Sequence, residues 1–134
     1  MRIVDIREVT INLKGGVSNA IVNFHKHTVS LVALISDQFS EGKPVVGFGF
    51  NSIGRFAQGE ILRERILPRL AEVAPEKLVN RSGSGFNAEA LAQIAMQNEK
   101  PGGHGDRAGA VAALELAAWD LNAKLLGEPA YKTL

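Results

Sequence analysis

The last third of the chain constrains its fold more than any other segment. Residues 107–126, RAGAVAALELAAWDLNAKLL, have a helix-forming sequence that is apolar on nearly every side. A helix of this kind has to be buried on several faces. The rest of the 134-residue chain offers little material to cover it. We therefore expect the chain to be part of a larger protein.

Charge and composition exclude several classes of function. The formal net charge is +1, from 15 basic and 14 acidic residues, which gives no indication of a nucleic-acid or acidic-membrane partner. The absence of cysteine excludes disulfides, thiolate nucleophiles and cysteine-based metal sites. The first residues lack the apolar stretch of a signal peptide, and the longest apolar stretch is too short to span a bilayer. We expect a cytoplasmic protein.

Three strand-like segments come first, over residues 3–13, 28–36 and 44–50. In the first, the apolar alternation slips at Arg7-Glu8, which indicates a bulge or a change of exposed face. The second reads as a strand buried on both faces or nearly so, and a polar connection of hairpin length, residues 37–43, follows it. Short connections between the strands favour an antiparallel meander.

Four helical segments follow the strands. Their boundaries are 57–72, which Pro68 is expected to kink or divide, and 75–81, 87–97 and 107–126. Asn87 is a candidate cap, and Gly127 stands where the last helix should end. Strands followed by helices, without alternation, predict a single α+β domain over residues 1–134.

Two polar loops next to the strands are candidate ligand sites. The first loop, residues 15–20, contains Asn19, whose side chain has both a donor and an acceptor. The second loop, residues 51–55, contains Asn51 and Arg55, and a guanidinium group can pair with a carboxylate. The alternative for both is an ordinary surface loop or turn.

A third loop, residues 100–106, precedes the last helix. Its three glycines allow the backbone to approach a ligand closely, and Lys100 and His104 could form an acid/base pair. Its sequence is neither a P-loop nor a dinucleotide fingerprint. Most lysines and histidines in such a loop are simply solvated, so the residues alone favour a structural role.

Three further features have mainly structural interpretations. His25 and His27 would share one face of a strand, as metal ligands sometimes do, but no third ligand is evident. Asp120 and Lys124 have the spacing of an ion pair on a helix. Trp119 has the character of a packing anchor at an interface.

The end of the chain resembles a known family signature. Residues 110–129, AVAALELAAWDLNAKLLGEP, resemble the first signature of the mandelate racemase/muconate lactonizing group of the enolase superfamily. The order of elements over all 134 residues is similar to the N-terminal capping domain of that group. The segments GFGFNSIGR (47–55) and NEKPGGHGDR (98–107) resemble the D-tartrate dehydratase branch. Ala130 and Thr133 depart from the aliphatic residues usual in the family.

The resemblance implies a two-domain enzyme whose cap covers a modified TIM barrel. The barrel would supply the magnesium ligands and a Lys-x-Lys base, so the resemblance places no catalytic or metal-binding residue in this chain. The cap's loops would select the substrate, and by resemblance Asn19, Ile53 and Lys100 contact it. Ile53 replaces a polar residue of the tartrate dehydratase pattern. Asn51 and Arg55 would hold the second loop's shape or meet the substrate.

The implied function is the cap of a magnesium-dependent acid-sugar dehydratase, in which loss of the proton alpha to a carboxylate precedes loss of water. One alternative is a non-catalytic binding or assembly module. Another is the cap of a racemase or cycloisomerase of the same superfamily. The expected partners are a small acid sugar, a C-terminal barrel and further copies of the chain. Without the barrel, the last helix should expose apolar surface and drive association.

Overall fold

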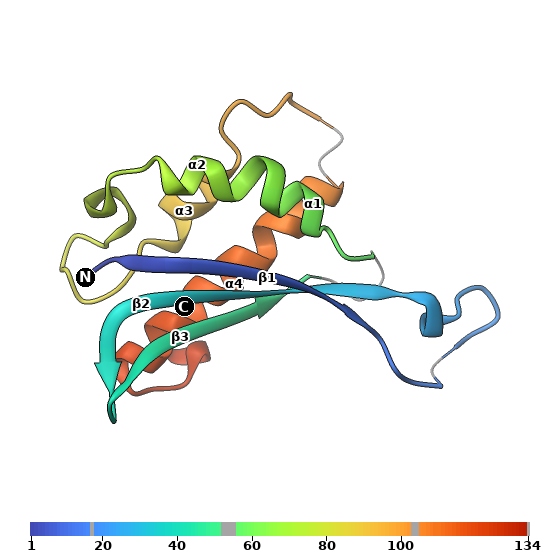
Figure 1. The fold of residues 1–134 in the computed structure, drawn as a ribbon, viewed down its shortest axis with the longest axis horizontal. Coiled ribbons are helices and arrows are strands. Elements are labelled where there is room, and N and C mark those ends of the chain that lie inside the picture. Colours follow the sequence, from blue (N-terminus) through green and yellow to red (C-terminus); the bar gives the residue numbers. More distant parts are fainter. Residues whose placement is uncertain (17, 52–55, 103–104, 134) are drawn as a thin grey trace.

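A three-stranded antiparallel meander forms the first part of the chain. The computed structural model describes residues 1–16, 18–51, 56–102 and 105–133. Strands β1 (Ile3–Asn12), β2 (Thr28–Ser40) and β3 (Lys43–Phe50) lie in the order β1-β2-β3 (Figure 1). The predicted antiparallel meander is therefore confirmed.

The slip in the apolar pattern of β1 is a change of face and not a bulge at Arg7-Glu8. The pairing of β1 with β2 is regular from Asp5 to Asn12, and its irregularity lies between Ile3 and Asp5. Ile6 packs against the core, whereas Val9 is on the outer face and exposed. Inward-facing Glu8 is covered because its carboxylate pairs with a guanidinium group, that of Arg63.

The hairpin between β2 and β3 is tighter than predicted. Residues 37–40 belong to β2, and only Glu41 and Gly42 form the turn. Both residues have positive φ, +50° and +75°. Two-residue hairpin turns with this backbone geometry have a twist that matches the twist of the strands they join. The N–H of Asp37 donates to the carbonyl of Arg2, so this polar segment is held at the sheet.

A continuous helical segment follows, over residues 59–71 where 57–72 was predicted. It consists of α1 (Gly59–Ile61), a π-helical stretch (Leu62–Ile66) and α2 (Leu67–Ala71). Pro68 lies in the first turn of α2. Because proline has no N–H and its ring crowds the preceding turn, an interruption of the regular α-helical pattern ahead of it is expected. The predicted division therefore takes the form of the π-helical stretch.

The remaining helices are α3 (Ala88–Ala95) and α4 (Gly105–Leu126), with short 3₁₀ turns at Phe24–Lys26, Pro75–Leu78 and Ala130–Lys132. The helix predicted over 75–81 is only a 3₁₀ turn. The Asn87 side chain accepts from the N–H of Ala90 at 3.0 Å, as its predicted cap requires. Gly127 has φ +68° at the end of α4, as a C-terminal cap requires. Among the described residues no helix is long and apolar enough to cross a membrane.

The core lies between the inner face of the sheet and α4, with α2 and α3 beside it (Figure 1). Most of α4 is covered by the chain's own elements, so the expectation that too little material remains to cover it is wrong. The helix is covered because many of its residues are small, so that β3 can lie directly against it. The large apolar residues of α4 that stay exposed are Leu116, at 51%, and Leu126, at 50%. Buried on α4 are Ala110, Val111, Ala113, Leu114, Ala117, Ala118, Leu121, Asn122 and Ala123.

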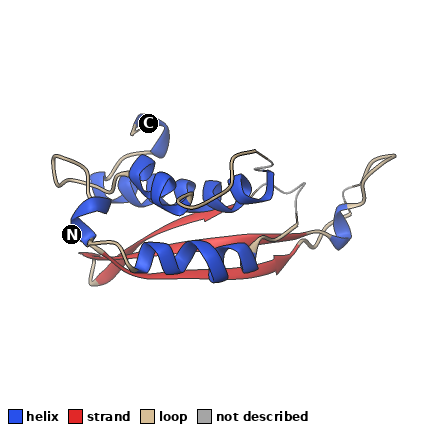
Figure 2. Cartoon of the chain, turned by 90° about the horizontal axis from the view of Figure 1, so that it is seen from above, coloured by secondary structure: helices blue, strands red, loops and turns tan. Residues whose placement is uncertain are grey.

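The outer face of the sheet is apolar but only half-buried. Leu31, Ala33 and Ile35 of β2 point to this side and form a shallow hollow with Val9 and Phe48. Figure 2 shows helices on one side of the sheet, with the other side uncovered. Of the burial predicted for both faces of β2, or nearly both, the described residues show full burial on the inner face: Val32 and Leu34 are buried, and their neighbours in sequence are half-buried.

Candidate functional site

The first and second candidate loops lie at one end of the sheet, and the helix that follows the third loop begins beside the second. The first loop connects the end of β1 to the start of β2, and the second follows β3 at the same end of the antiparallel sheet. The third loop precedes α4, whose first turn lies beside the residues that follow the second loop (Figure 1). Residues 52–55 of the second loop and residues 103–104 of the third lie outside the described residues. Predicted site residues Ile53, Arg55 and His104 are among them.

A buried hydrogen-bond network connects the second and third loops. Gln58, 6% exposed, lies at its centre. Its N–H donates to Ser30 Oγ at 2.8 Å, and its Oε1 accepts from Asn51 Nδ2 at 3.1 Å. Its Nε2 donates to Asp106 Oδ1 at 3.3 Å. One side chain therefore links the end of β3 to the start of α4.

Asn51 is 1% exposed, and both the oxygen and the nitrogen of its side chain form hydrogen bonds within the chain. Its Oδ1 accepts from the N–H of Ser30 at 2.7 Å, and its Nδ2 also donates to the carbonyl of Phe56 at 2.9 Å. These bonds close the second loop, because they join the residue before it to one after it. Of the two roles considered for Asn51, the geometry matches the one that holds the loop's shape.

The base of the first loop rests on the end of the second. The ring of His27 stacks on Phe56, with centroids 4.4 Å apart and an interplanar angle of 17°. Thr28 Oγ1 accepts from the N–H of Ala57 at 2.9 Å. His27 is thus a buried packing residue, whereas His25 lies in the exposed 3₁₀ turn, so the two histidines do not share a strand face.

Asn19 lies exposed in the first loop and shapes it. Its Oδ1 accepts from the N–H groups of Ile21 and Val22, at 2.9 and 2.8 Å. Its own N–H donates to the carbonyl of Val22. The acceptor of this side chain is therefore used by the loop, and its amide nitrogen is the part that a ligand would meet.

Glu99 anchors the third loop through a cluster of three arginines. Its carboxylate, 5% exposed, binds Arg107 at 2.9 Å, Arg69 at 2.7 Å and also Arg65. The hydrogen bonds from Arg107 and Arg69, followed by that from Arg65, lower the pKa of Glu99 from 4.5 to about 2. Glu99 is therefore charged across the physiological range.

Arg107 connects the carboxylate of Glu99 to the main chain of the third loop. Its guanidinium donates to the carbonyl of Lys100 at 3.0 Å and to the carbonyl of Gly102. The main chain of Lys100 is thus fixed on one side, while its side chain is exposed. An exposed ammonium group on a fixed backbone is suited to meeting a carboxylate as a point charge.

A polar cleft of about 710 Å³ lies between these anchors. Thr10 and Thr28 line it from the sheet, Glu60 and Arg63 from the helical segment, and Asp106 from α4. The cleft offers hydroxyl, guanidinium and carboxylate groups for hydrogen bonding. It contains no cysteine or histidine, and the described residues hold no cluster of three His, Cys, Asp or Glu that could bind a metal.

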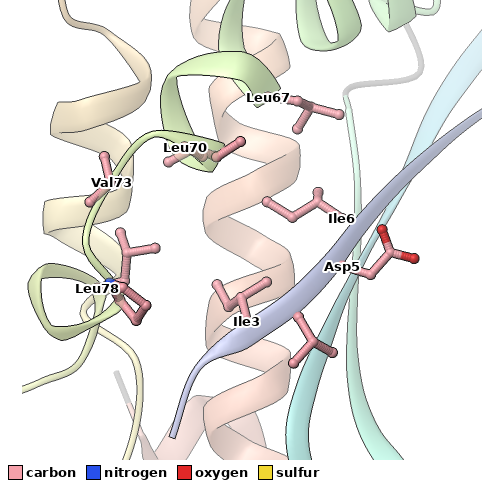
Figure 3. A pocket seen from close by; sticks show the side chains of 10 residues that line it. Ile3, Asp5, Ile6, Leu67, Leu70, Val73 and Leu78 are labelled. Carbon is pink, nitrogen blue, oxygen red and sulfur yellow. The ribbon is translucent and has the colours of Figure 1, made fainter.

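A second cavity, of about 410 Å³, lies between β1 and the helical segment, where Pro75 and Leu78 also line it (Figure 3). Ile3, Ile6, Leu67 and Leu70 make most of it apolar. The carboxylate of Asp5 points away from these side chains. This cavity therefore has no polar group arranged for chemistry.

Sequence reasoning missed the two residues that organise the site, Gln58 and Glu99. The partners of Gln58 lie 7, 28 and 48 residues away in the chain, so no local pattern indicates it. Glu99 stands directly before Lys100, and its spacing of eight from Arg107 is the signal that could have suggested a pair across the loop.

No family model matches the chain. Its structure is similar to a crystal structure of a mandelate racemase/muconate lactonizing enzyme-like protein from Rubrobacter xylanophilus, with a TM-score of 0.55 and 21% sequence identity. The match covers 97% of this chain and 32% of that one, so the chain spans about a third of the length of the structure it matches. The likeness shows the fold alone, an α+β fold in which a three-stranded antiparallel sheet is followed by helices.

Proposed function

We propose that this chain is the substrate-selecting cap of a magnesium-dependent acid-sugar dehydratase of the enolase superfamily that acts on tartrate or a close relative. The observation that carries the proposal is the joining of the second and third loops by Gln58 at one end of a domain with the capping fold. Loops that close over a reaction centre must be held in place by a rigid scaffold.

Each proposed contact has a role that its chemistry supports. Lys100 presents an exposed ammonium group for the distal carboxylate of a diacid. Asn19 offers its amide nitrogen to a substrate hydroxyl. Ile53 keeps the substrate contact that the resemblance implies. Arg55 either holds the shape of the second loop or meets a substrate carboxylate. Asn51 acts on the substrate through the shape of the second loop.

The chemical step that we propose begins with removal of the proton alpha to a carboxylate and ends with departure of the β-hydroxyl as water. In the proposed enzyme, magnesium and the base belong to a barrel domain outside this chain. The contribution of this chain is to orient the distal groups and to exclude water while the cap is closed.

The test is a dehydration assay on the protein expressed from its own gene, with a panel of diacid and monoacid sugars. We expect a keto-acid product from a diacid, loss of that activity in a chelator and its return with Mg²⁺. Activity on monoacids alone would overturn the tartrate assignment.

Exchange of the alpha proton with solvent deuterium separates the other outcomes. Exchange without dehydration would identify a racemase or cycloisomerase and overturn the dehydratase proposal. The absence of exchange with any acid sugar would indicate a non-catalytic module and overturn the enzyme proposal as a whole.

A further inference from the structure

We propose that the outer face of the sheet binds the outer face of a second copy of this chain, with the two-fold axis of the pair along β2. In Figure 1 the strands lie in front of α4, so this face is turned towards the viewer. A contiguous apolar surface left open on a folded domain is typical of an interaction site. Four large apolar side chains of this face are between 40% and 55% exposed: Val9, Ile11, Phe48 and Phe50.

The pairing of the strands arranges the outer face in three rows. Each row runs from β1 through β2 to β3, and the rows are Asp5-Ile35-Val46, Arg7-Ala33-Phe48 and Val9-Leu31-Phe50. At the β1 side the first two rows begin with opposite charges, since Asp5 and Arg7 form an exposed ion pair at 2.6 Å. The carboxylate of Asp5 points away from the inner cavity (Figure 3). The β1 rim of the face is therefore negative in the first row and positive in the second.

The β3 rim carries the opposite order of charges. Lys124 Nζ donates to the carbonyl of Val46 at 2.9 Å and lies 4.8 Å from the ring centre of Phe48, so its ammonium group reaches round the edge of the sheet. The carboxylate of Asp120 accepts from the N–H of Phe48 at 2.7 Å. This rim is therefore positive beside the first row and negative beside the second.

One two-fold axis brings these opposite charges together. An axis along β2 lays β1 of each copy over β3 of the other and keeps the rows aligned. Asp5 then meets Lys124 of the second copy, and Arg7 meets Asp120 of the second copy. An axis across the strands would lay each β1 over the other β1, where no such complement is present. Charge complementarity therefore selects the axis along β2.

The apolar centre of the face suits the same arrangement. The third row places Val9 over Phe50 of the second copy. Ala33 lies on the axis and lines the shallow hollow of this face, which leaves room for Leu31 and Ile35 of the two copies to interdigitate. Sheets that pack face to face lie about 10 Å apart and cross at about 30°, a rotation that Arg and Lys side chains at the rims can span.

The size of the face sets the strength of the pairing. Three strands about 4.8 Å apart, over eight residues at about 3.3 Å each, give a face of roughly 400 Å². This is about half of the roughly 800 Å² that each partner contributes to an interface of standard size. We therefore expect a dimer that forms and dissociates at concentrations on the order of micromolar.

The test is sedimentation equilibrium of the 134-residue chain at about 1–100 µM. We expect an equilibrium between monomer and dimer, with a dissociation constant within this range. Ala33→Lys places a charge on the axis of the pair and should raise the dissociation constant by about a hundredfold, which removes the dimer. The matched control is Ala74→Lys, because Ala74 is exposed and lies outside the sheet, and it should leave the dimer unchanged.

A second variant tests the orientation of the two copies. Exchanging Asp5 and Arg7, as Asp5→Arg with Arg7→Asp, keeps the composition and the ion pair within β1 but sets like charges against each other across the dimer. The dissociation constant should rise about tenfold. Salt should act in opposite directions: from about 0.05 M to about 0.5 M it should weaken the original dimer and strengthen that of the exchange variant, because it screens both attraction and repulsion.

Three outcomes would overturn the proposal. The first is a monomer throughout the concentration range, and the second is a dimer that Ala33→Lys leaves intact, which would place the contact elsewhere. The third is an exchange variant that dimerises as well as the original chain, which would leave the apolar face to another orientation or another partner.

Two further measurements apply if a variant does not fold. In place of Ala33→Lys, Phe50→Ser removes a side chain that is more than half exposed in the monomer, and a dimer at least about tenfold weaker is then required. In place of the exchange variant, the salt dependence of the original chain decides, and a dimer that salt does not weaken overturns the orientation. No substrate is used, so the result is independent of the proposed function.

Discussion

Gly47 of β3 lies directly against the backbone of Ala117 in α4. A Cβ placed on Gly47 would be 2.1 Å from the carbonyl oxygen of Ala117, well inside the contact distance of real atoms. A Cβ placed on Gly49 would likewise lie 2.1 Å from the carbonyl oxygen of Ala113. The edge strand and the last helix therefore pack backbone to backbone, and glycine at these two positions is what permits it.

Gly47→Ala should destabilise the domain by about 1–3 kcal/mol or more, because the helix has to move away from the strand. The measurement is the free energy of unfolding in urea. Gly16→Ala is the control, since nothing lies within 4 Å of its Cβ position and its φ is not positive. Equal stability of the two variants would contradict the close approach.

Asp120 stabilises the free edge of β3. Its carboxylate accepts from the N–H of Phe48 at 2.7 Å and pairs with Lys124, which itself donates to the carbonyl of Val46 at 2.9 Å. The predicted ion pair is therefore confirmed, and it also provides partners for the strand edge, which would otherwise be open to pairing with another chain.

Asp120→Ala should cost about 1–2 kcal/mol of unfolding free energy, since the strand loses a charge-assisted hydrogen bond. Asp5→Asn is the matched control, because Asp5 forms an exposed pair with Arg7 at 2.6 Å and such pairs contribute little. Urea unfolding of both variants is the measurement. A loss as large in Asp5→Asn as in Asp120→Ala would show that the strand edge has no special role.

Glu99 should make stability depend on pH in the acid range. Its pKa is lowered in the folded state from 4.5 to about 2, so folding favours the charged form. The stability it contributes is fully present above the unfolded value, near pH 4.5, and is lost as the pH falls towards 2. Glu99→Gln should therefore be less stable than the original at pH 7, and the difference should narrow between these two values.

The measurement for this prediction is a series of unfolding curves from pH 7 down to pH 2 for both proteins. Glu89→Gln is the control, because Glu89 on α3 is exposed and its hydrogen-bond partner is the neutral amide of Gln93. A stability difference for Glu99→Gln that stays constant to the lowest pH would show that the arginines do not bind the charged carboxylate.

The elements of this fold could be predicted from local patterns because their causes are local. The strand pattern of β1 and the helix cap at Asn87 depend only on residues that are close together in the sequence. The coverage of α4 by the chain's own strands could not be predicted, since it depends on Gly47 and Gly49, which lie about 70 residues from the helix positions they touch. A helix surface that is apolar on nearly every side does not by itself show which element of the fold will cover it.

The candidate site was also only partly predictable from the sequence. Polar and glycine-rich composition located the three loops, and Asn51 was singled out in the second. Its role there was left open, because its bonds to Ser30 and Gln58 depend on how β2 and the helical segment are placed. The resemblance to a family supplied Lys100, whereas the anchor that fixes its backbone, Arg107, follows only from the three-dimensional contacts.

Lys100→Ala provides the most direct test of the proposed substrate contact. The side chain is exposed, and Arg107 binds the backbone of this residue and not its amine, so the substitution should leave the fold intact. In the proposed enzyme, the loss of a charged partner for a distal carboxylate costs about 1.5–3 kcal/mol, which corresponds to a reduction in kcat/KM for a diacid of tenfold to about a hundredfold. A monoacid sugar, which has no distal carboxylate, should lose little. Lys77→Ala, in the exposed 3₁₀ turn at the opposite end of the domain, is the control and should affect neither substrate. An equal loss on diacid and monoacid would mean that Lys100 acts on the whole site and not on the distal group, and unchanged kinetics would remove it from the site.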